Sequence, residues 1–241
     1  KICLYVLICF LLIPSIVFAE DNELVSRNVK YYKTTYENDF NVALLSSDKN
    51  FTIEISEDEY NSIDASVDLM SSNTYQTDYK KMTASIYSSG SNYKYQVNLE
   101  WKNIPKVRSN DIIGIGYSSE FVNIVDGISF FQNFCTSDGC KTSIKHELIN
   151  SSAGKSAVFS LPTSSLTYLN QIFSFTVVKK ITEKIISQTI SGDYSHATSK
   201  ININNALKHS VDVDSGIKLY NSISSYYDSI PVTKTTWTGS W

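Results

Sequence analysis

The clearest pattern in the chain is an alternation of apolar and polar residues over positions 93–101, where every second side chain is apolar. The same alternation precedes it, with Met82, Ala84 and Ile86 separated by polar residues. A period of two places the apolar side chains of a segment on one face of a strand. The connection between the two segments, residues 88–92, is Ser-Ser-Gly-Ser-Asn, which is typical of a hairpin turn. We therefore predict an antiparallel hairpin with one buried and one solvated face.

Other segments rich in β-branched and aromatic residues follow, and turn signals separate them every eight to fifteen residues. This composition favours strands over helices. Strands are predicted at residues 111–117, 128–135, 140–148, 156–161, 171–179 and 181–191, with two weaker ones at 199–204 and 211–220. The pattern predicts an all-β fold, an antiparallel β-sandwich. Two packed β subdomains are the alternative, divided near residues 150–156.

One short helix is also predicted. Ser56 followed by Glu59 matches the capping box that opens a helix, here one ending near Ile63. The acidic residues at 57–59 fit the positive end of the helix dipole.

An apolar run occupies residues 2–18, after Lys1 and before Ala19 and an acidic Glu20. This order is that of a cleaved secretory signal peptide. An uncleaved membrane anchor is the alternative, but a spanning helix needs about 20 apolar residues, and Pro14 interrupts this run. We predict a signal peptide at 1–19, an extended N-terminal segment at 20–50 and a β-sandwich-like region at 51–241. The mature protein is then secreted, and we expect no membrane contact after cleavage.

Charge excludes one class of partner. Removal of the signal peptide moves the formal charge from −3 to −4, because Lys1 leaves with it, and the chain holds only two arginines. Nucleic-acid binding needs clustered Lys and Arg against the phosphates. We therefore expect no nucleic-acid partner, and no motif in the chain points to a cofactor.

The cysteine spacing predicts one disulfide. Cys3 and Cys9 belong to the signal peptide, which leaves Cys135 and Cys140 in the mature chain. An even pair in an exported protein indicates a disulfide, and the intervening Ser-Asp-Gly is a turn sequence. The spacing is not the C-x-x-C of a redox or metal site, so we predict a disulfide that staples a hairpin turn.

The least generic part of the chain is the run WKNIPKVRSND at residues 101–111. Together with EISEDEY at 54–60 and DYSHA at 193–197, it resembles a group of uncharacterised secreted proteins of Gram-positive bacteria that carry a W-K-x-x-P-K-x-R-S-x-D run. The resemblance extends over most of the mature chain. It implies a secreted bacterial β-rich protein, and it brings no activity and no catalytic residue.

Within this run, two roles are open for Arg108. The structural role is to pair with Asp111 or to cap backbone carbonyls after Pro105 has ended the strand. The other role is contact with a ligand. We keep Arg108 as a candidate ligand-binding residue.

No catalytic set is evident. The three histidines, His146, His196 and His209, have no zinc-binding spacing, and the chain has no G-x-S-x-G nucleophile elbow. Ser195 and His196 would face opposite sides of a strand. We assign no catalytic residue, and whether the protein is an enzyme stays open.

A weak calcium candidate is the segment with Asp212 and Asp214, which resembles the start of a calcium loop. It lacks a third ligand before Gly216 and a closing Glu. A solvated turn is the alternative, and no metal is predicted.

Aromatic density is the feature that most favours a function. Tyr226, Tyr227, Trp237 and Trp241 lie outside the predicted strands. Flat aromatic faces on a β-sandwich stack on sugars or on proteins, although they also close the ends of a sandwich. These four residues are candidate ligand-binding residues.

The function we expect is a secreted β-rich binding protein whose partner is an extracellular protein or glycan. Two alternatives stay open. One is an extracellular hydrolase of the glycosidase type, which needs two carboxylates across a cleft. The other is a membrane-active or pore-forming protein, in which residues 171–191 would insert as a hairpin.

Overall fold

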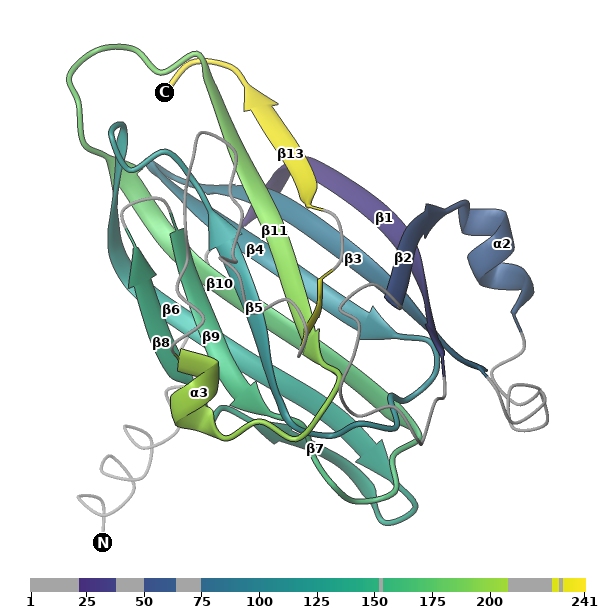
Figure 1. Ribbon diagram of the computed structural model, residues 1–241. Helices are drawn as coiled ribbons and strands as arrows, with labels where there is room; N and C mark the ends of the chain where they lie inside the picture. The colour runs from purple at the N-terminus through teal and green to yellow at the C-terminus, as the bar shows by residue number, and fades with distance from the viewer. Residues whose placement is uncertain (1–21, 38–49, 64–74, 152–153, 208–226, 230–231) are drawn as a thin grey trace, which may run out of the picture.

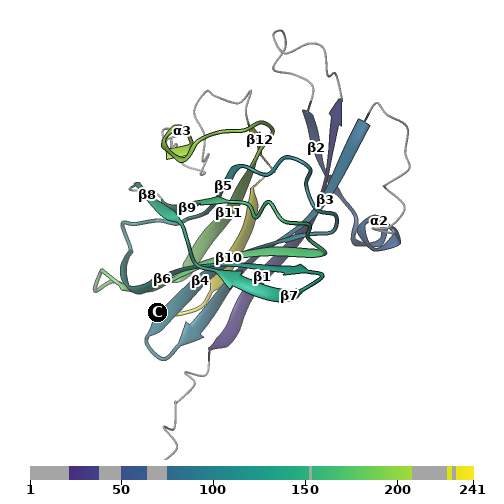
Figure 2. The same cartoon turned by 90° about the horizontal axis from the view of Figure 1, so that it is seen from below.

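A computed structural model describes residues 22–37, 50–63, 75–151, 154–207, 227–229 and 232–241 (Figure 1). The described residues form an all-β sandwich of two antiparallel sheets, as predicted. Figure 2 shows the two sheets as layers. The predicted signal peptide lies outside the described residues. None of the helices in the described part of the chain is long and apolar enough to span a membrane.

The first sheet has seven strands in the order β2-β1-β3-β4-β10-β6-β7. Their bounds are β2 Asn50–Ile55, β1 Glu23–Glu37, β3 Tyr75–Ser89, β4 Asn92–Trp101, β10 Tyr168–Lys179, β6 Val122–Thr136 and β7 Gly139–Ser143. The hairpin predicted from alternation is β3–β4, paired from Ser89 opposite Asn92 to Lys80 opposite Trp101. That prediction is confirmed.

The second sheet has the order β12-β11-β5-β9-β8, and β13 also pairs with β11. The bounds are β12 Tyr227–Ser229, β11 Ser187–Ala197, β5 Asn110–Gly116, β9 Gly154–Ser160, β8 Glu147–Ser151 and β13 Thr233–Thr238. Strands β8 and β9 pair with each other on either side of the point near 150–156 where we considered a division. Strands β8 and β9 are therefore neighbours in one sheet.

The core lies between the sheets and is rich in aromatic rings. From the first sheet come Tyr95, Val97, Leu99, Phe173 and Phe175, and from the second Ile113, Ile115, Phe159, Ile190 and Tyr194. Each set alternates with side chains on the other face of its strand, which is the period-two pattern. At Gly192 the sheets approach closely, because a Cβ there would lie 2.9 Å from a methyl of Val97.

The predicted short helix is α2 (Glu57–Ser62). Ser56 is its N-cap, and the Ser56 hydroxyl accepts a hydrogen bond from the Glu59 backbone N–H at 3.1 Å. The helix lies on the outer face of the first sheet, where Tyr60 packs on Tyr31 with 4.9 Å between ring centroids. The predicted helix and its Ser56 N-cap are confirmed.

Some predicted strands differ from the structure. Strand β11 begins only at Ser187 and runs to Ala197, not over 181–191. Residues 140–148 hold two short strands, β7 and β8, in different sheets. The strand predicted at 199–204 is wrong: residues 203–207 form helix α3 (Ile203–Leu207), whose Ala206 is buried. The strand predicted at 211–220 lies outside the described residues.

The segment 20–50 contains a long strand. Residues 23–37 form β1, which lies inside the first sheet and pairs with both β2 and β3. This strand forms part of the framework of the fold.

The predicted disulfide joins Cys135 of β6 to Cys140 of β7, which lie opposite each other in the hairpin. Both residues are at the edge of the first sheet.

We expect the double variant Cys135→Ser, Cys140→Ser to fold, because the closed loop is short. Chain-entropy arithmetic gives about 2 kcal/mol for such a loop, and this corresponds to a fall in Tm of about 4–8 °C for a chain of this size. Thermal unfolding by circular dichroism measures it. Wild-type protein in reductant is the control and should show the same fall. Loss of folding in the variant would contradict this account.

Candidate functional site

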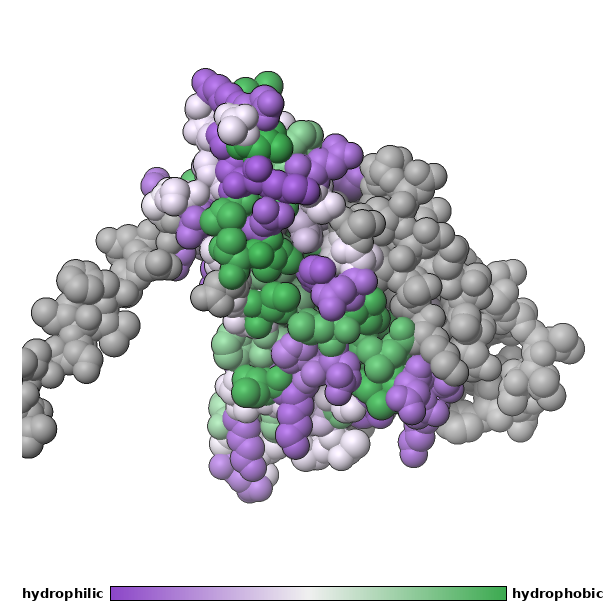
Figure 3. All heavy atoms as spheres, turned by 90° about the vertical axis from the view of Figure 1, so that its left-hand side faces the viewer, coloured by the Kyte–Doolittle hydropathy of each residue, from purple (hydrophilic) through white to green (hydrophobic). Residues whose placement is uncertain are grey.

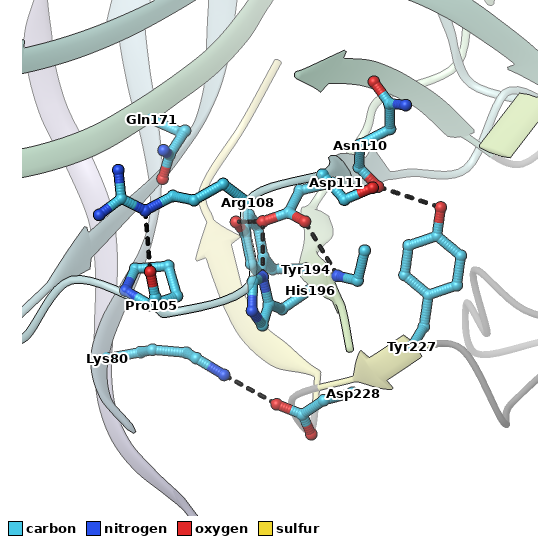
Figure 4. A network of polar contacts seen from close by, with 12 residues as sticks. Lys80, Pro105, Arg108, Asn110, Asp111, Gln171, Tyr194, His196, Tyr227 and Asp228 are labelled. Carbon is cyan, nitrogen blue, oxygen red and sulfur yellow. Dashed lines mark hydrogen bonds and ion pairs between the residues drawn. The ribbon is translucent and has the colours of Figure 1, made fainter. Parts of the chain in front are cut away.

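Polar side chains gather inside the sandwich, at the end where strand β4 stops (Figure 4). Trp101, the last residue of β4, is buried among them. The Lys80 ammonium lies 4.8 Å from its ring centroid, and the His196 ring centroid lies at 5.0 Å. Lys80 belongs to the first sheet and His196 to the second, so the two sheets meet on this indole. We call the residues Lys80, Trp101, Asp111, Tyr194, His196 and Asp228 the interior polar cluster.

Asp111 organises the half of this cluster in the second sheet. Its Oδ1 accepts the backbone N–H of Ala197 at 2.9 Å, and its Oδ2 accepts the Tyr194 hydroxyl. His196 Nδ1 lies 2.9 Å from the same Oδ2. A carboxylate can only accept hydrogen bonds, so Nδ1 of the ring carries the proton. Three donors on one buried carboxylate satisfy it without water.

Lys80 and Asp228 form the other half. Lys80 Nζ lies 2.8 Å from Asp228 Oδ2, and the two side chains are 0% and 4% exposed. Thr34 donates to Oδ2 at 3.0 Å, and Thr52 donates to Oδ1. Strand β3 holds Lys80 and β12 holds Asp228, so this contact joins the two sheets.

The charges of this pair set the pKa of Asp228. Burial alone would raise the pKa of the carboxyl, but the charge and hydrogen bond of Lys80, the Thr52 hydroxyl and the nearby His196 outweigh it. The pKa of Asp228 is therefore lowered, and the residue is a carboxylate as long as it is paired with an ammonium.

All side chains of the interior polar cluster are buried, so the groups they contact are other residues of the same fold. Its members come from five strands, and only the fold brings them together. Sequence reasoning missed Lys80, Asp111 and Asp228 as a site. One available signal was that the alternation of Met82, Ala84 and Ile86 continues to Lys80.

Arg108 caps backbone carbonyls, the second of the two structural contacts that we considered. Its Nε donates to the Pro105 carbonyl at 2.8 Å. Its Nη1 donates to the carbonyls of Pro162 and Ser164 at 2.8 and 2.7 Å. The guanidinium thus joins the loop after β4 to the loop before β10. Its ligand role stays a prediction.

The aromatic candidates are separated in the fold. Trp237 and Trp241 both pack on Tyr93, with ring centroids 5.0 and 4.5 Å away, at the end of the β3–β4 hairpin. Tyr227 is buried, and its hydroxyl donates to the Asn110 carbonyl at 3.1 Å. Tyr226 lies outside the described residues. The three that are described therefore do not form one exposed patch.

The calcium candidates Asp212 and Asp214 also lie outside the described residues, as does His209. Within the described ranges, no group of three or more His, Cys, Asp or Glu side chains is placed to hold a metal ion.

Comparison with known proteins gives weak matches only. No protein-family model and no curated protein matches the chain. The crystal structure of the collagen binding domain of surface protein RspB from Erysipelothrix rhusiopathiae matches with a TM-score of 0.32 and 7% identity, over 69% of this chain and 67% of that one. The C-terminal domain of the AgI/II polypeptide BspA from Streptococcus agalactiae matches with 0.31 and 9%, over 69% and 79%. Similarity at this level carries no argument about function.

We expect Asp111→Ala to lower the free energy of unfolding by about 3–5 kcal/mol, the cost of removing one member of a buried polar pair. Urea unfolding measures it. Glu54→Ala is the matched control, because Glu54 pairs with Lys30 at the surface and such pairs contribute less than about 1 kcal/mol. Equal effects of the two substitutions would contradict the role of Asp111.

Arg108→Ala should lower the free energy of unfolding by about 2 kcal/mol, because three carbonyls lose a charged donor. Arg27→Ala, at an exposed position, should change it by less than about 0.5 kcal/mol. Unchanged stability of Arg108→Ala, combined with lost ligand binding, would favour the ligand role instead.

Proposed function

We propose that this protein is an extracellular binding protein that takes an extended segment of a partner protein at the edge of strand β6. The observation that carries the proposal is the edge itself. Strand β6 has fifteen residues, and β7 pairs only with Gln132–Thr136 at its end. Among the described strands, none pairs with residues 122–131 on the side away from β10.

Apolar side chains are exposed along this edge. Phe121, Val125 and Phe131 are 39%, 50% and 41% exposed. They lie on the outer face of the sheet, opposite to the buried Val122 and Phe130. Figure 3 shows hydrophobic residues gathered in a band on the side of the molecule where β6 and β8 lie. Long edges with exposed apolar residues recruit further strands, and natural proteins usually protect them.

Strand addition fits this edge. The partner's main chain would pair with β6, and its alternate side chains would contact the exposed apolar residues. A bulge around Gly127, which has a φ of 70°, divides the edge in two. The partner segment is therefore short, or it bends at the bulge.

Two further observations bear on the alternatives. Strands β10 and β11, which a membrane-inserting hairpin would need, are inner strands of different sheets. The acidic residues at 57–59 occupy the first turn of α2. Neither arrangement favours the pore-forming or the hydrolase interpretation.

Secretion rests on the signal-peptide pattern, and a disulfide is typical of exported proteins.

Selection from a library of random peptides tests the proposal. We expect extended peptides with alternating apolar residues to bind the wild-type protein. Val125→Lys should weaken their binding at least about tenfold, because a charge on an edge strand opposes pairing. Ile186→Lys is the control, since Ile186 is an exposed apolar residue in a loop. Biolayer interferometry measures both.

Three outcomes would contradict the proposal: no peptide is selected, both variants bind equally well, or both lose binding equally. A titration of tryptophan fluorescence with cell-wall polysaccharides covers the glycan alternative. Binding to polysaccharide without binding to any peptide would overturn the choice of a protein partner.

A further inference from the structure

We propose that Lys80 and Asp228 form an isopeptide bond, an amide between Nζ of the lysine and Cγ of the aspartate, which links the two sheets covalently. The reaction is internal to the fold and independent of the binding function. The argument rests on contact, on the donors around the carboxyl group, on burial and on a balanced reaction.

The reacting groups are already in contact. Lys80 Nζ lies 2.8 Å from Asp228 Oδ2, and Cγ is one bond further. Reacting atoms held about 3–3.5 Å apart are in near-attack geometry, which removes most of the entropic cost of bringing them together. The two residues are 148 positions apart in the chain, so only the folded protein achieves this contact.

Both oxygens of the carboxyl group have hydroxyl donors. Thr34 donates to Oδ2 and Thr52 to Oδ1. When the amine attacks Cγ, negative charge develops on the carboxyl oxygen, and donors already aimed at it stabilise that charge. Thr34 also lies 3.2 Å from Lys80 Nζ, so the same hydroxyl contacts the nucleophile and the electrophile.

Burial supplies the driving force. The side chains are 0% and 4% exposed, and the ring of Trp101 covers the ammonium. Two charges held away from water carry a large desolvation cost, which their mutual attraction repays only in part. An amide has neither charge, so its formation removes that cost. Exclusion of water also protects the amide from hydrolysis.

The step balances without any co-reactant. The ammonium first passes one proton to the carboxylate, giving a neutral amine and a neutral acid. The amine nitrogen attacks Cγ and forms the C–N bond. The acid hydroxyl then leaves with a second proton from the nitrogen, as one water molecule. No atom is oxidised or reduced.

The bond would hold an element that has few other contacts. Strand β12 has three residues and pairs with β11 alone in its sheet. A covalent link from Asp228 to β3 fixes this short strand against the first sheet.

Mass spectrometry of the full-length, folded protein tests the proposal. After denaturation without reductant, we expect a mass lower than that of the disulfide-bonded chain by one water molecule. Digestion should then yield a branched peptide that contains both Lys80 and Asp228. A full-mass protein, with tryptic cleavage after Lys80 and a linear peptide around Asp228, overturns the proposal.

Substitutions at the two residues show whether the lost water molecule comes from this pair. Lys80→Arg keeps the positive charge but cannot form this amide, so the water loss should disappear. Lys81→Arg is the matched control, because Lys81 lies on the other face of β3 and should keep it. Asp228→Asn should lose ammonia instead of water and give the same amide. Persistence of the water loss in Lys80→Arg means dehydration elsewhere and also overturns the proposal. If a variant does not fold, the wild-type branched peptide still decides.

Discussion

The packing of the two sheets depends on how the polar groups around Trp101 are paired. A sandwich interior tolerates charged groups only when each has a partner, because an unpaired buried charge costs several kcal/mol. Here Lys80 arrives on the first sheet and Asp228 on the second. Neither is satisfied until the sheets meet. The cluster therefore opposes any packing in which the strands are shifted by one residue, since a shift moves Lys80 to the other face.

Local pairing explains why part of the fold was predictable. Strands β3 and β4 are neighbours in the chain, and their hairpin has one face directed to the core. Alternation is then visible in the sequence. Strand β1 is different: Tyr32 is buried on the inner face, and the adjacent Tyr31 is buried under α2 on the outer face. Burial on both faces removes the period of two, so residues 20–50 showed no strand pattern.

The same reason accounts for β11. Its residues 190–197 are buried on both faces, because Tyr194 and His196 point into the sandwich while Ala197 packs with Tyr227 and Ala206 outside it. Polar residues at buried positions, such as Ser195, also weaken any hydrophobic signal. The prediction therefore placed this strand too early, at 181–191, where apolar residues are more regular. Non-local partners, not local preference, determine where β11 lies.

The site was predictable only in fragments. The run WKNIPKVRSND was predicted to be the least generic part of the chain, and DYSHA belongs to the same resemblance. The fold brings these two runs together: Asp111 from the first accepts a hydrogen bond from Tyr194 and contacts His196 from the second. What made them unusual is that they place polar residues in a core. Asp228 had no such signal, because a three-residue strand is too short to show a period.

The two lateral sides of the sandwich are closed by different contacts. On one side β13 pairs with β11 of the second sheet, while Thr235 and the Lys234 carbonyl bond to Ser26 and Asn28 of β1 in the first. On the other side, the chain crosses between sheets at residues 144–146, where His146 packs on Phe130. Strand β7, which ends just before this crossing, pairs only with the last residues of β6. None of the described strands pairs with the rest of that edge of β6. One side of the sandwich is therefore closed by β13, whereas the β6 edge still exposes apolar area, which is why the proposed function places a partner segment there.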